Sequence, residues 1–211
     1  MVENDSDSIV YSKNVIEFVT VAKEYCAFMD AHSAHSRNNF LGKAQKLLPL
    51  LYLKAALLPD MEEIDGESPA KFVTEVDYAF LQQKISAKLG EFDSYPEVFD
   101  SGMQYSETAL DASISENLCD IYQDMKDFIM AFRIGALDEM TGALCEVQYQ
   151  FKTYWGQKLV NVLRAIHHRI YSESDPNDTA YPGEQLFGAD RWLNQHFKGH
   201  SPEEEGGDHD V

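Results

Sequence analysis

The sequence predicts an all-α fold, a single-domain bundle of about five main helices. Three observations predict it. Apolar residues recur at spacings of three and four through most of the chain, as they do on one face of a helix. Residues that start and stop helices flank these stretches, and Ser113 and Gly135 are an example. No segment shows a convincing strand pattern, and no internal repeat is present.

Length and composition favour one globular domain. The chain has 211 residues, of which 44% are hydrophobic and 12% aromatic, enough to bury a core and too apolar for wholesale disorder. We expect the helical bundle over residues 9–198. The acidic ends, residues 1–8 and 199–211, are expected to be disordered because they lack an apolar face.

The first two helices are predicted at residues 13–31 and 39–58. Ser12 is the expected N-cap of the first. Pro49 lies inside the second and lacks a backbone donor, so it predicts a kinked or split helix.

The third helix is expected to begin with Ser68 as cap and Pro69 in the first helical position, and to end at Gly90. Its expected apolar face is Phe72, Val73, Val76, Phe80 and Ile85.

The fourth and fifth helices carry the clearest patterns. In the fourth, Ser113 and Glu116 have the spacing of a capping box, and Gly135 follows the last apolar residue. The fifth, the longest, is expected over about residues 138–171, and two consecutive four-residue steps around Trp155 let its stripe drift past Gly156. Its apolar stripe is Met140, Leu144, Val147, Phe151, Trp155, Leu159, Val162, Ile166 and Ile170.

Charge restricts the classes of partner. Lys and Arg total 17 against 36 Asp and Glu, a formal net charge of -19 that no cluster of Lys and Arg interrupts. Such a field repels phosphate backbones and anionic lipids, so we expect neither nucleic acid nor a membrane as partner. A protein partner with a basic surface is favoured, and a homo-oligomer through an exposed apolar patch is the other possibility.

Location follows from two features. The acidic N-terminus does not resemble a secretory signal, and no window is apolar enough to span a membrane. The chain has three cysteines at scattered positions, Cys26, Cys119 and Cys145. An odd, scattered set is typical of reduced thiols in a cytosolic protein.

An acidic flank on the fourth helix is the main candidate site. We define it as Glu116, Asp120, Asp124 and Asp127, which lie along one side of the helix. Like charges four residues apart destabilise a helix. Three explanations are open: the flank is solvated, it pairs with Arg164 or Arg169 of the fifth helix, or it binds a metal or a basic partner.

Trp155, Gly156 and His167 are further candidates. Gly156 costs about 1 kcal/mol in a helix interior relative to Ala, so close approach of a helix, a ring or a ligand is expected there. His167 borders the apolar stripe and is expected to be partly buried, in a structural role or in a ligand or proton-transfer role. His168 faces away and is expected to be solvated.

No motif identifies a catalytic residue, a cofactor site or a metal site. The chain lacks a phosphate-binding glycine loop, a nucleophile elbow and the E-x-x-H spacing of di-iron bundles. An acidic loop around Gly66 fails the calcium-loop pattern because Met61 and Phe72 occupy its end positions.

Three segments together carry a family resemblance: "KLLPLLYLKAALLP" at 46–59, "SENLCDIYQDMKDF" at 115–128 and "FKTYWGQKLVNVLRAIH" at 151–167. Over about residues 10–171 the chain resembles domain of unknown function 5063, a bacterial family. The resemblance implies an all-helical fold and no established activity, so it transfers no catalytic residue. The acidic flank and the Trp155–Gly156 pair fall in its recurring segments.

Two functions from different classes are therefore predicted. The first is a cytosolic bacterial binding or adaptor module that acts through an acidic face. The alternative is an enzyme or metal-dependent protein that uses the carboxylates of the fourth helix. A deep pocket with convergent polar groups would favour the alternative.

Overall fold

The all-α prediction is confirmed by the computed structural model. It describes residues 9–61, 70–96 and 111–172, all within one unit, Met1–Ser174. The predicted disordered ends and Ser68 and Pro69 lie outside these ranges, as does the expected domain boundary at residue 198. The main helices are α2 (Lys13–Asp30), α3 (Arg37–Ala56), α4 (Glu75–Leu89), α5 (Ile114–Ile134), α6 (Leu137–Gln150) and α7 (Gly156–Ser172).

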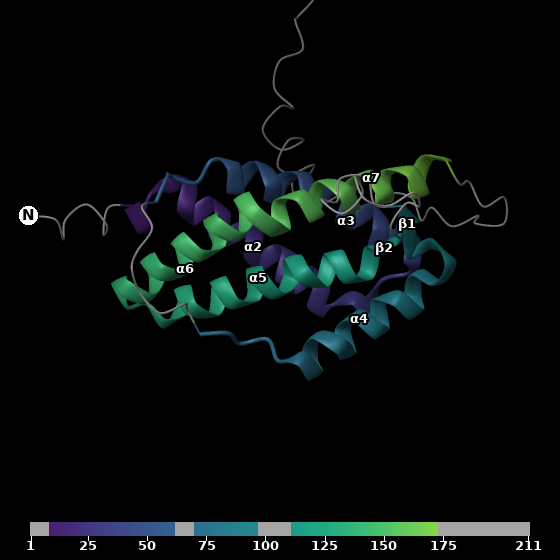
Figure 1. The fold of residues 1–211 in the computed structure, drawn as a ribbon, viewed down its shortest axis with the longest axis horizontal. Coiled ribbons are helices and arrows are strands. Elements are labelled where there is room, and N and C mark those ends of the chain that lie inside the picture. The colour runs from purple at the N-terminus through teal and green to yellow at the C-terminus, as the bar shows by residue number, and fades with distance from the viewer. Residues whose placement is uncertain (1–8, 62–69, 97–110, 173–211) are drawn as a thin grey trace, which may run out of the picture. The chain divides into compact units, whose positions relative to one another are not determined.

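Helix α5 is the centre of the bundle, because it packs against α2, α4, α6 and α7 (Figure 1). Its core-facing side is apolar: Ile114, Leu118, Ile121 and Met125 are fully buried. The two ends also match the sequence. Ser113 Oγ accepts the amide of Glu116 at 3.2 Å, and Gly135 takes the left-handed conformation that ends the helix, with φ of 81°.

Helix α3 packs against α2 and α7 and is continuous through Pro49, so the predicted kink is not confirmed. Pro49 lies on the exposed side of the helix. Water can bond a carbonyl that lacks its amide partner there, which lowers the cost of the proline.

The predicted start of the third helix is wrong. Helix α4 begins at Glu75, where Thr74 Oγ1 accepts the amide of Asp77 at 3.1 Å. Its apolar face agrees with the prediction only in part: Ile85 is buried as expected, and Leu81 and Leu89 are buried as well. Val76 and Phe80, two members of the predicted face, are 77% and 58% exposed. In Figure 1, α4 lies at the margin of the bundle beside α5.

A two-stranded sheet corrects the expectation that no strand is present. Strand β1 (Ser94–Pro96) pairs antiparallel with β2 (Asp111–Ser113), and Tyr95 lies opposite Ala112. A 3-10 turn, η2 (Gly90–Phe92), leads into β1, and another, η1 (His32–Ala34), follows α2. Three-residue strands are too short to show an alternating pattern in the sequence.

The predicted fifth helix is interrupted. A π-helical segment, η4 (Phe151–Trp155), separates α6 from α7. The apolar stripe shows why, because Phe151, Trp155 and Leu159 follow one another at four-residue steps. A π turn absorbs the resulting drift and keeps both halves of the stripe on the core. Val147, Trp155, Leu159 and Val162 are accordingly buried.

Candidate functional site

The four carboxylates of the acidic flank lie in different environments. The Asp120 side chain is only 11% exposed and accepts three hydrogen bonds from three other helical segments. Tyr78 of α4 donates at 2.7 Å, and Tyr154 and Lys158 donate at 3.2 and 2.5 Å. Burial opposes the charge of Lys158, yet its hydrogen bond to Asp120 leaves the Lys158 pKa raised. Asp120 therefore ties α5 to α4 on one side and to η4 and α7 on the other.

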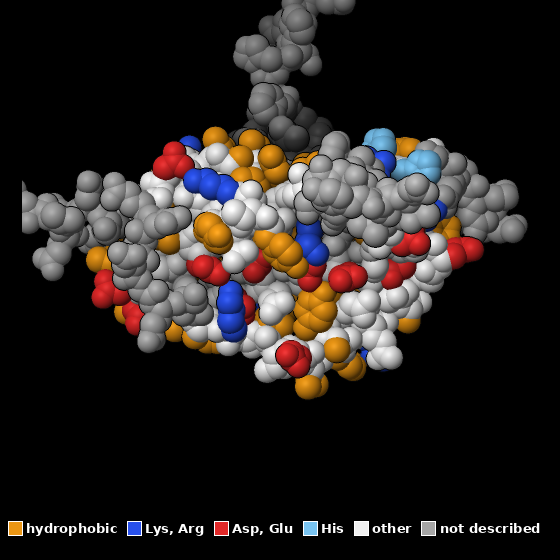
Figure 2. All heavy atoms as spheres, viewed as in Figure 1, with side chains coloured by type: hydrophobic (Ala, Val, Ile, Leu, Met, Phe, Trp, Pro, Cys, Tyr) orange, Lys and Arg blue, Asp and Glu red, His pale blue; other side chains and the backbone are white. Residues whose placement is uncertain are grey.

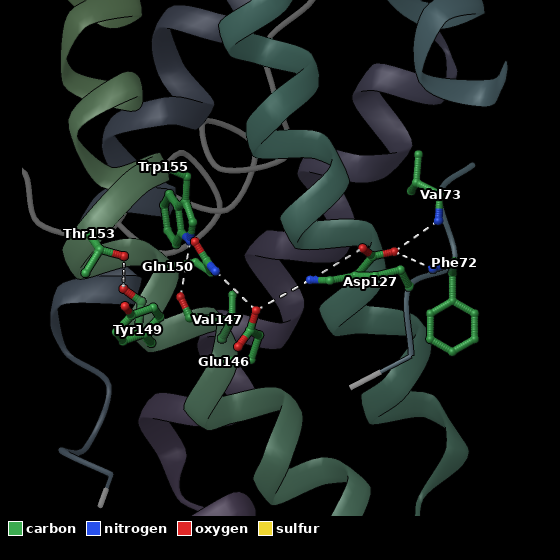
Figure 3. Close-up of polar contacts among 10 residues, drawn as sticks. Phe72, Val73, Asp127, Glu146, Val147, Tyr149, Gln150, Thr153 and Trp155 are labelled. Atoms are coloured by element: carbon green, nitrogen blue, oxygen red, sulfur yellow. Dashed lines mark hydrogen bonds and ion pairs between the residues drawn. The ribbon is translucent and has the colours of Figure 1, made fainter. Parts of the chain in front are cut away.

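Asp127 fastens the segment that precedes α4. Its carboxylate is 5% exposed, and Oδ1 accepts the amides of Phe72 and Val73 at 2.7 and 3.0 Å. Figure 3 shows Asp127 directed from α5 toward these two amides. Lys71 lies between Asp127 and Glu146, with N–O distances of 3.9 and 3.5 Å. These contacts hold residues 72 and 73 outside the helix that the sequence predicts for them.

Asp124 lies between Asp120 and Asp127 along α5, and its carboxylate has fewer hydrogen-bond partners than theirs. Its Oδ2 is buried and has no hydrogen-bond partner among the described residues. Burial, helped by the charges of Asp127 and Asp120, raises the pKa of Asp124 to about 7, although Lys71 opposes the shift. A cavity of about 20 Å³ lies beside Asp124 and Asp127, enough for one water and no substrate. Glu116, the last member, is exposed.

Pairing with Arg164 or Arg169, one of the three explanations left open for the flank, is not observed among the described residues. Arg164 donates to the carbonyl of Pro96 at 3.2 Å, and Arg169 donates to that of Ser94 at 2.7 Å. Both arginines therefore hold β1 against α7. The cation that pairs with the flank is Lys158, which bonds Asp120 because it lies closer along α7 to the middle of α5.

A carboxylate that the sequence analysis missed caps α5. Asp93 is 8% exposed, and its two oxygens accept the amide and the hydroxyl of Ser115 at 2.7 and 2.8 Å. Its backbone carbonyl accepts the amide of Ile114 at 2.8 Å. A negative charge at a helix N-terminus is stabilising. Only the β1–β2 pairing brings Asp93 to this place, so no local signal marks it.

Trp155 and Gly156 have structural roles. Trp155 is fully buried, and its indole N–H donates to the carbonyl of Val147 at 3.2 Å (Figure 3). A Cβ added to Gly156 would lie 2.3 Å from the carbonyl oxygen of Phe151 and 2.9 Å from its ring. The π turn thus brings the backbone of Phe151 so close that only glycine fits. The expected close contact of a ring at Gly156 comes from a residue five positions earlier in the chain.

His167 is exposed, which corrects its expected partial burial. Its Nδ1 lies 3.4 Å from Nε2 of Gln45 on α3, and its ring centroid lies 4.6 Å from that of Tyr171. His168 is also exposed. Among the residues that the structure describes, no group of three or more His, Cys, Asp or Glu side chains could hold a metal ion.

The cysteines have no nucleophilic setting. Burial raises the pKa of Cys26 and of Cys119 to about 12, and burial also raises the pKa of Cys145. All three stay protonated near neutral pH, as the helical pattern predicts for core thiols.

An open groove between α4, α5 and the end of α2 was not found by sequence reasoning. Its volume is about 330 Å³. The groove is defined by an apolar floor and a polar rim. The floor is Phe72, Val73, Phe80, Leu81, Tyr122 and Met130. The rim is Asp30, His32, Asp77 and Lys126.

The rim of the groove is organised by hydrogen bonds. Asp30 accepts the Tyr122 hydroxyl at 2.6 Å and the Lys126 ammonium at 2.8 Å. Asp77 accepts the Thr74 hydroxyl at 2.7 Å. The rim carries two carboxylates, Asp30 and Asp77, and one ammonium, Lys126, so its net charge is negative. No local sequence signal marks the groove, because the apolar spacing of the third helix assigns Phe80 to the core although it is 58% exposed.

Comparison with known proteins gives a family and a related structure. The model of the family described as "Domain of unknown function (DUF5063)" matches residues 9–172. The chain is similar to the crystal structure of protein BF1032 from Bacteroides fragilis, at 43% identity and a TM-score of 0.70. The match covers 79% of this chain and 98% of that one. The search of curated proteins found no match.

Proposed function

We propose that this chain, which belongs to the family Domain of unknown function (DUF5063), is a binding module that holds a segment of a partner protein in the groove between α4 and α5. The observation that carries the proposal is the groove itself. It combines about 330 Å³ of open volume with an apolar floor and an exposed Phe80. Large exposed aromatic side chains beside an apolar hollow are typical of surfaces that bind other proteins.

The chemistry of the groove indicates its ligand. Its floor suits one or two apolar side chains, and Met130 gives it an adaptable surface. Its rim, together with the net charge of -19, favours Lys or Arg next to those apolar side chains. The expected ligand is therefore a basic, apolar peptide segment. We therefore propose the groove as the site of the basic partner, in place of the acidic flank, whose Asp120 and Asp127 already accept hydrogen bonds within the chain.

The enzyme alternative has less support. Asp124 is the flank carboxylate with the most perturbed pKa, and such residues often mark active sites. The adjacent cavity of about 20 Å³ admits a water molecule, however, and leaves no room for a substrate. Burial without a partner is sufficient to explain the raised pKa of Asp124.

The proposed setting is the cytoplasm of a bacterium. The protonated cysteines and the similarity to a Bacteroides fragilis protein support this setting. None of the described helices is long and apolar enough to cross a membrane.

Peptide binding to the full chain tests the proposal. Labelled peptides with the same Leu and Phe residues but basic, neutral or acidic flanks would be titrated and followed by fluorescence anisotropy. We expect the basic peptide to bind most tightly, and Phe80→Ser to weaken it by roughly tenfold, about 1.4 kcal/mol. Val76→Ser is the control, because Val76 is also an exposed apolar residue of α4 but does not line the groove.

Two outcomes would contradict the proposal. One is equal affinity for the three peptides in wild type. The other is equal affinity of wild type and Phe80→Ser for the basic peptide. Thermal unfolding of both variants confirms that the bundle is intact, as expected for side chains that are 58% and 77% exposed.

A further inference from the structure

Two buried carboxylate oxygens on α5 lie beside one small cavity and lack a hydrogen-bond donor. Oδ2 of Asp124 and Oδ2 of Asp127 have no hydrogen-bond partner among the described residues, although Asp127 is only 5% exposed. The two residues are three positions apart, so both lie on one side of the helix. Both line the cavity of about 20 Å³, which holds one water molecule. Buried oxygens without donors disfavour two negative charges, and a proton on one carboxylate relieves both.

The charges around the cavity favour a proton on Asp124. Asp120 and Asp127 of α5 and Glu146 of α6 are negative, and Lys71 is the cation that opposes them. Asp127 and Glu146 face one another across the Lys71 ammonium (Figure 3), and the Lys71 side chain is 49% exposed. Acidic side chains also lie across the middle of the face in Figure 2, where α5 lies in Figure 1. These surroundings add to the effect of burial, which raises the pKa of Asp124 to about 7.

The cavity adjoins the segment that forms part of the groove floor. Ala70 and Lys71 line the cavity, and the next two residues, Phe72 and Val73, line the groove. Asp127 links the two places, because its Oδ1 accepts the amides of Phe72 and Val73 and Asp127 itself lines the cavity. A change of charge in the cavity therefore acts on the part of the chain that a peptide in the groove would contact.

Residues 70–73 form the wall of the cavity that is least firmly held. The other walls belong to α5 and α6, two helices that pack against each other. Ala70 and Lys71, in contrast, are exposed and lie outside any helix. When Asp124 ionises, water reaches the new charge most easily by displacement of this wall. That displacement weakens the bonds from Phe72 and Val73 to Asp127 and disturbs the groove floor.

We propose that Asp124, Asp127 and residues 70–73 form a proton-sensitive latch on the groove. With a proton on Asp124, the segment stays in place and the groove holds its peptide. When Asp124 loses that proton, the segment loosens and the peptide is released. The latch rests on the proposed function, because it regulates binding in the same groove. Affinity should therefore be higher at pH 6 than at pH 8, on the two sides of the Asp124 pKa of about 7.

The binding test uses the full chain and the peptide with neutral flanks. A basic peptide is unsuitable, because ionisation of Asp124 would by charge alone favour it at high pH. Fluorescence anisotropy should show roughly fivefold weaker binding to wild type at pH 8 than at pH 6. Asp124→Asn should bind equally at both, since its amide is neutral at either pH and donates hydrogen bonds as the protonated carboxyl does.

Two variants control for other causes of pH dependence. Asp138→Asn is the matched control, because it makes the same substitution at an exposed position of α6 outside the cavity and the groove. Histidines titrate in the same pH range, and His32 lines the groove rim, so His32→Gln is the second control. Both variants should keep the pH dependence of wild type.

Hydrogen exchange tests the latch without a peptide. In wild type, the amides of Phe72 and Val73 should be less protected at pH 8 than at pH 6 after correction for the intrinsic exchange rate. In Asp124→Asn their protection should be equal at the two pH values. The amide of Leu144, buried in α6, is the internal control and should change less than the two segment amides in wild type.

Several results would overturn the proposal. Equal protection of the Phe72 and Val73 amides at both pH values in wild type would exclude release of the segment, whether or not a peptide binds. A pH dependence of binding that Asp124→Asn shares with wild type, or that His32→Gln removes, would assign it to other groups. Failure of every peptide to bind at either pH would overturn the proposed function, and the exchange of the two amides would still decide whether the segment is released. Thermal unfolding checks each variant, and wild-type exchange decides the question if Asp124→Asn is unstable.

Discussion

Lys158 of α7 and Asp120 of α5 are joined by a contact of 2.5 Å between Nζ and Oδ2. The pair is largely shielded from solvent, since the two side chains are 26% and 11% exposed. Asp120 also accepts the hydroxyls of Tyr78 and Tyr154. A single carboxylate therefore connects α5 with α4, η4 and α7, and this explains how acidic residues spaced along one helix are tolerated.

The first prediction concerns this connection. Asp120→Ala removes the acceptor for three donors, all of them more than 30 residues away in sequence. We expect the free energy of unfolding to fall by about 2 to 4 kcal/mol, because a partly buried ammonium and two hydroxyls lose their partner. Urea denaturation measures it. Glu116→Gln, at the exposed end of the flank, is the control and should change stability by less than about 0.5 kcal/mol. Equal effects at both positions would show that Asp120 is merely solvated.

The second prediction concerns pH. The pKa of Asp124 is raised by burial from 3.8 to about 7, so the folded state binds a proton more tightly than the unfolded state. Its contribution to stability is complete below about pH 4 and is lost as pH rises toward 7. Asp124→Asn should remove this loss and stabilise the protein at pH 8 by roughly 1 to 3 kcal/mol relative to wild type.

Denaturation of wild type and Asp124→Asn at pH 5 and pH 8 measures the effect. The change in stability between the two pH values should be smaller in the variant. Glu24→Gln, an exposed acidic residue on α2, should keep the wild-type dependence. A variant whose pH dependence equals that of wild type would mean that Asp124 titrates normally.

The third prediction compares two helical glycines. Gly156→Ala places a Cβ against the carbonyl of Phe151, so we expect a loss of about 1 to 3 kcal/mol and a larger loss for Gly156→Leu. Gly42 in α3 has nothing within 4 Å of the corresponding position. Gly42→Ala should therefore stabilise the protein by about 0.5 to 1 kcal/mol through helix propensity. Melting temperatures that move in the same direction for both substitutions would contradict the role assigned to the π turn.

The fourth prediction concerns metal ions. Asp120 and the Oδ1 atom of Asp127 accept hydrogen bonds within the chain, and Asp124 lies beside a cavity for one water. We expect added Mg, Mn, Ca or Zn to leave the unfolding midpoint of wild type unchanged. The double variant Asp120→Asn, Asp124→Asn should show the same lack of metal dependence. A midpoint that rises with metal only in wild type, as mass action requires for a ligand of the native state, would restore the metal-dependent alternative.

The acidic flank shows how far a helical pattern can be interpreted. Spacing alone places Asp120, Asp124 and Asp127 on one side of α5, and the structure agrees. Spacing does not identify the partners, because Tyr78, Lys71 and Lys158 come from segments whose positions depend on the packing of α4 and α7. The same limit applies to Arg164 and Arg169, which meet β1.

The sequence by itself determined the elements whose signals are local. Periodicity and capping placed α2, α3 and α5 to within a few residues, since apolar spacing and the Ser113 and Gly135 ends act within one or two turns. Tertiary structure decided the rest. Asp127 holds Phe72 and Val73 out of α4, the pairing of β1 with β2 brings Asp93 to α5, and a π turn makes Gly156 necessary. Each of these depends on contacts between residues far apart in the chain or on a backbone shift inside a helix, and neither leaves a periodic signal in the sequence.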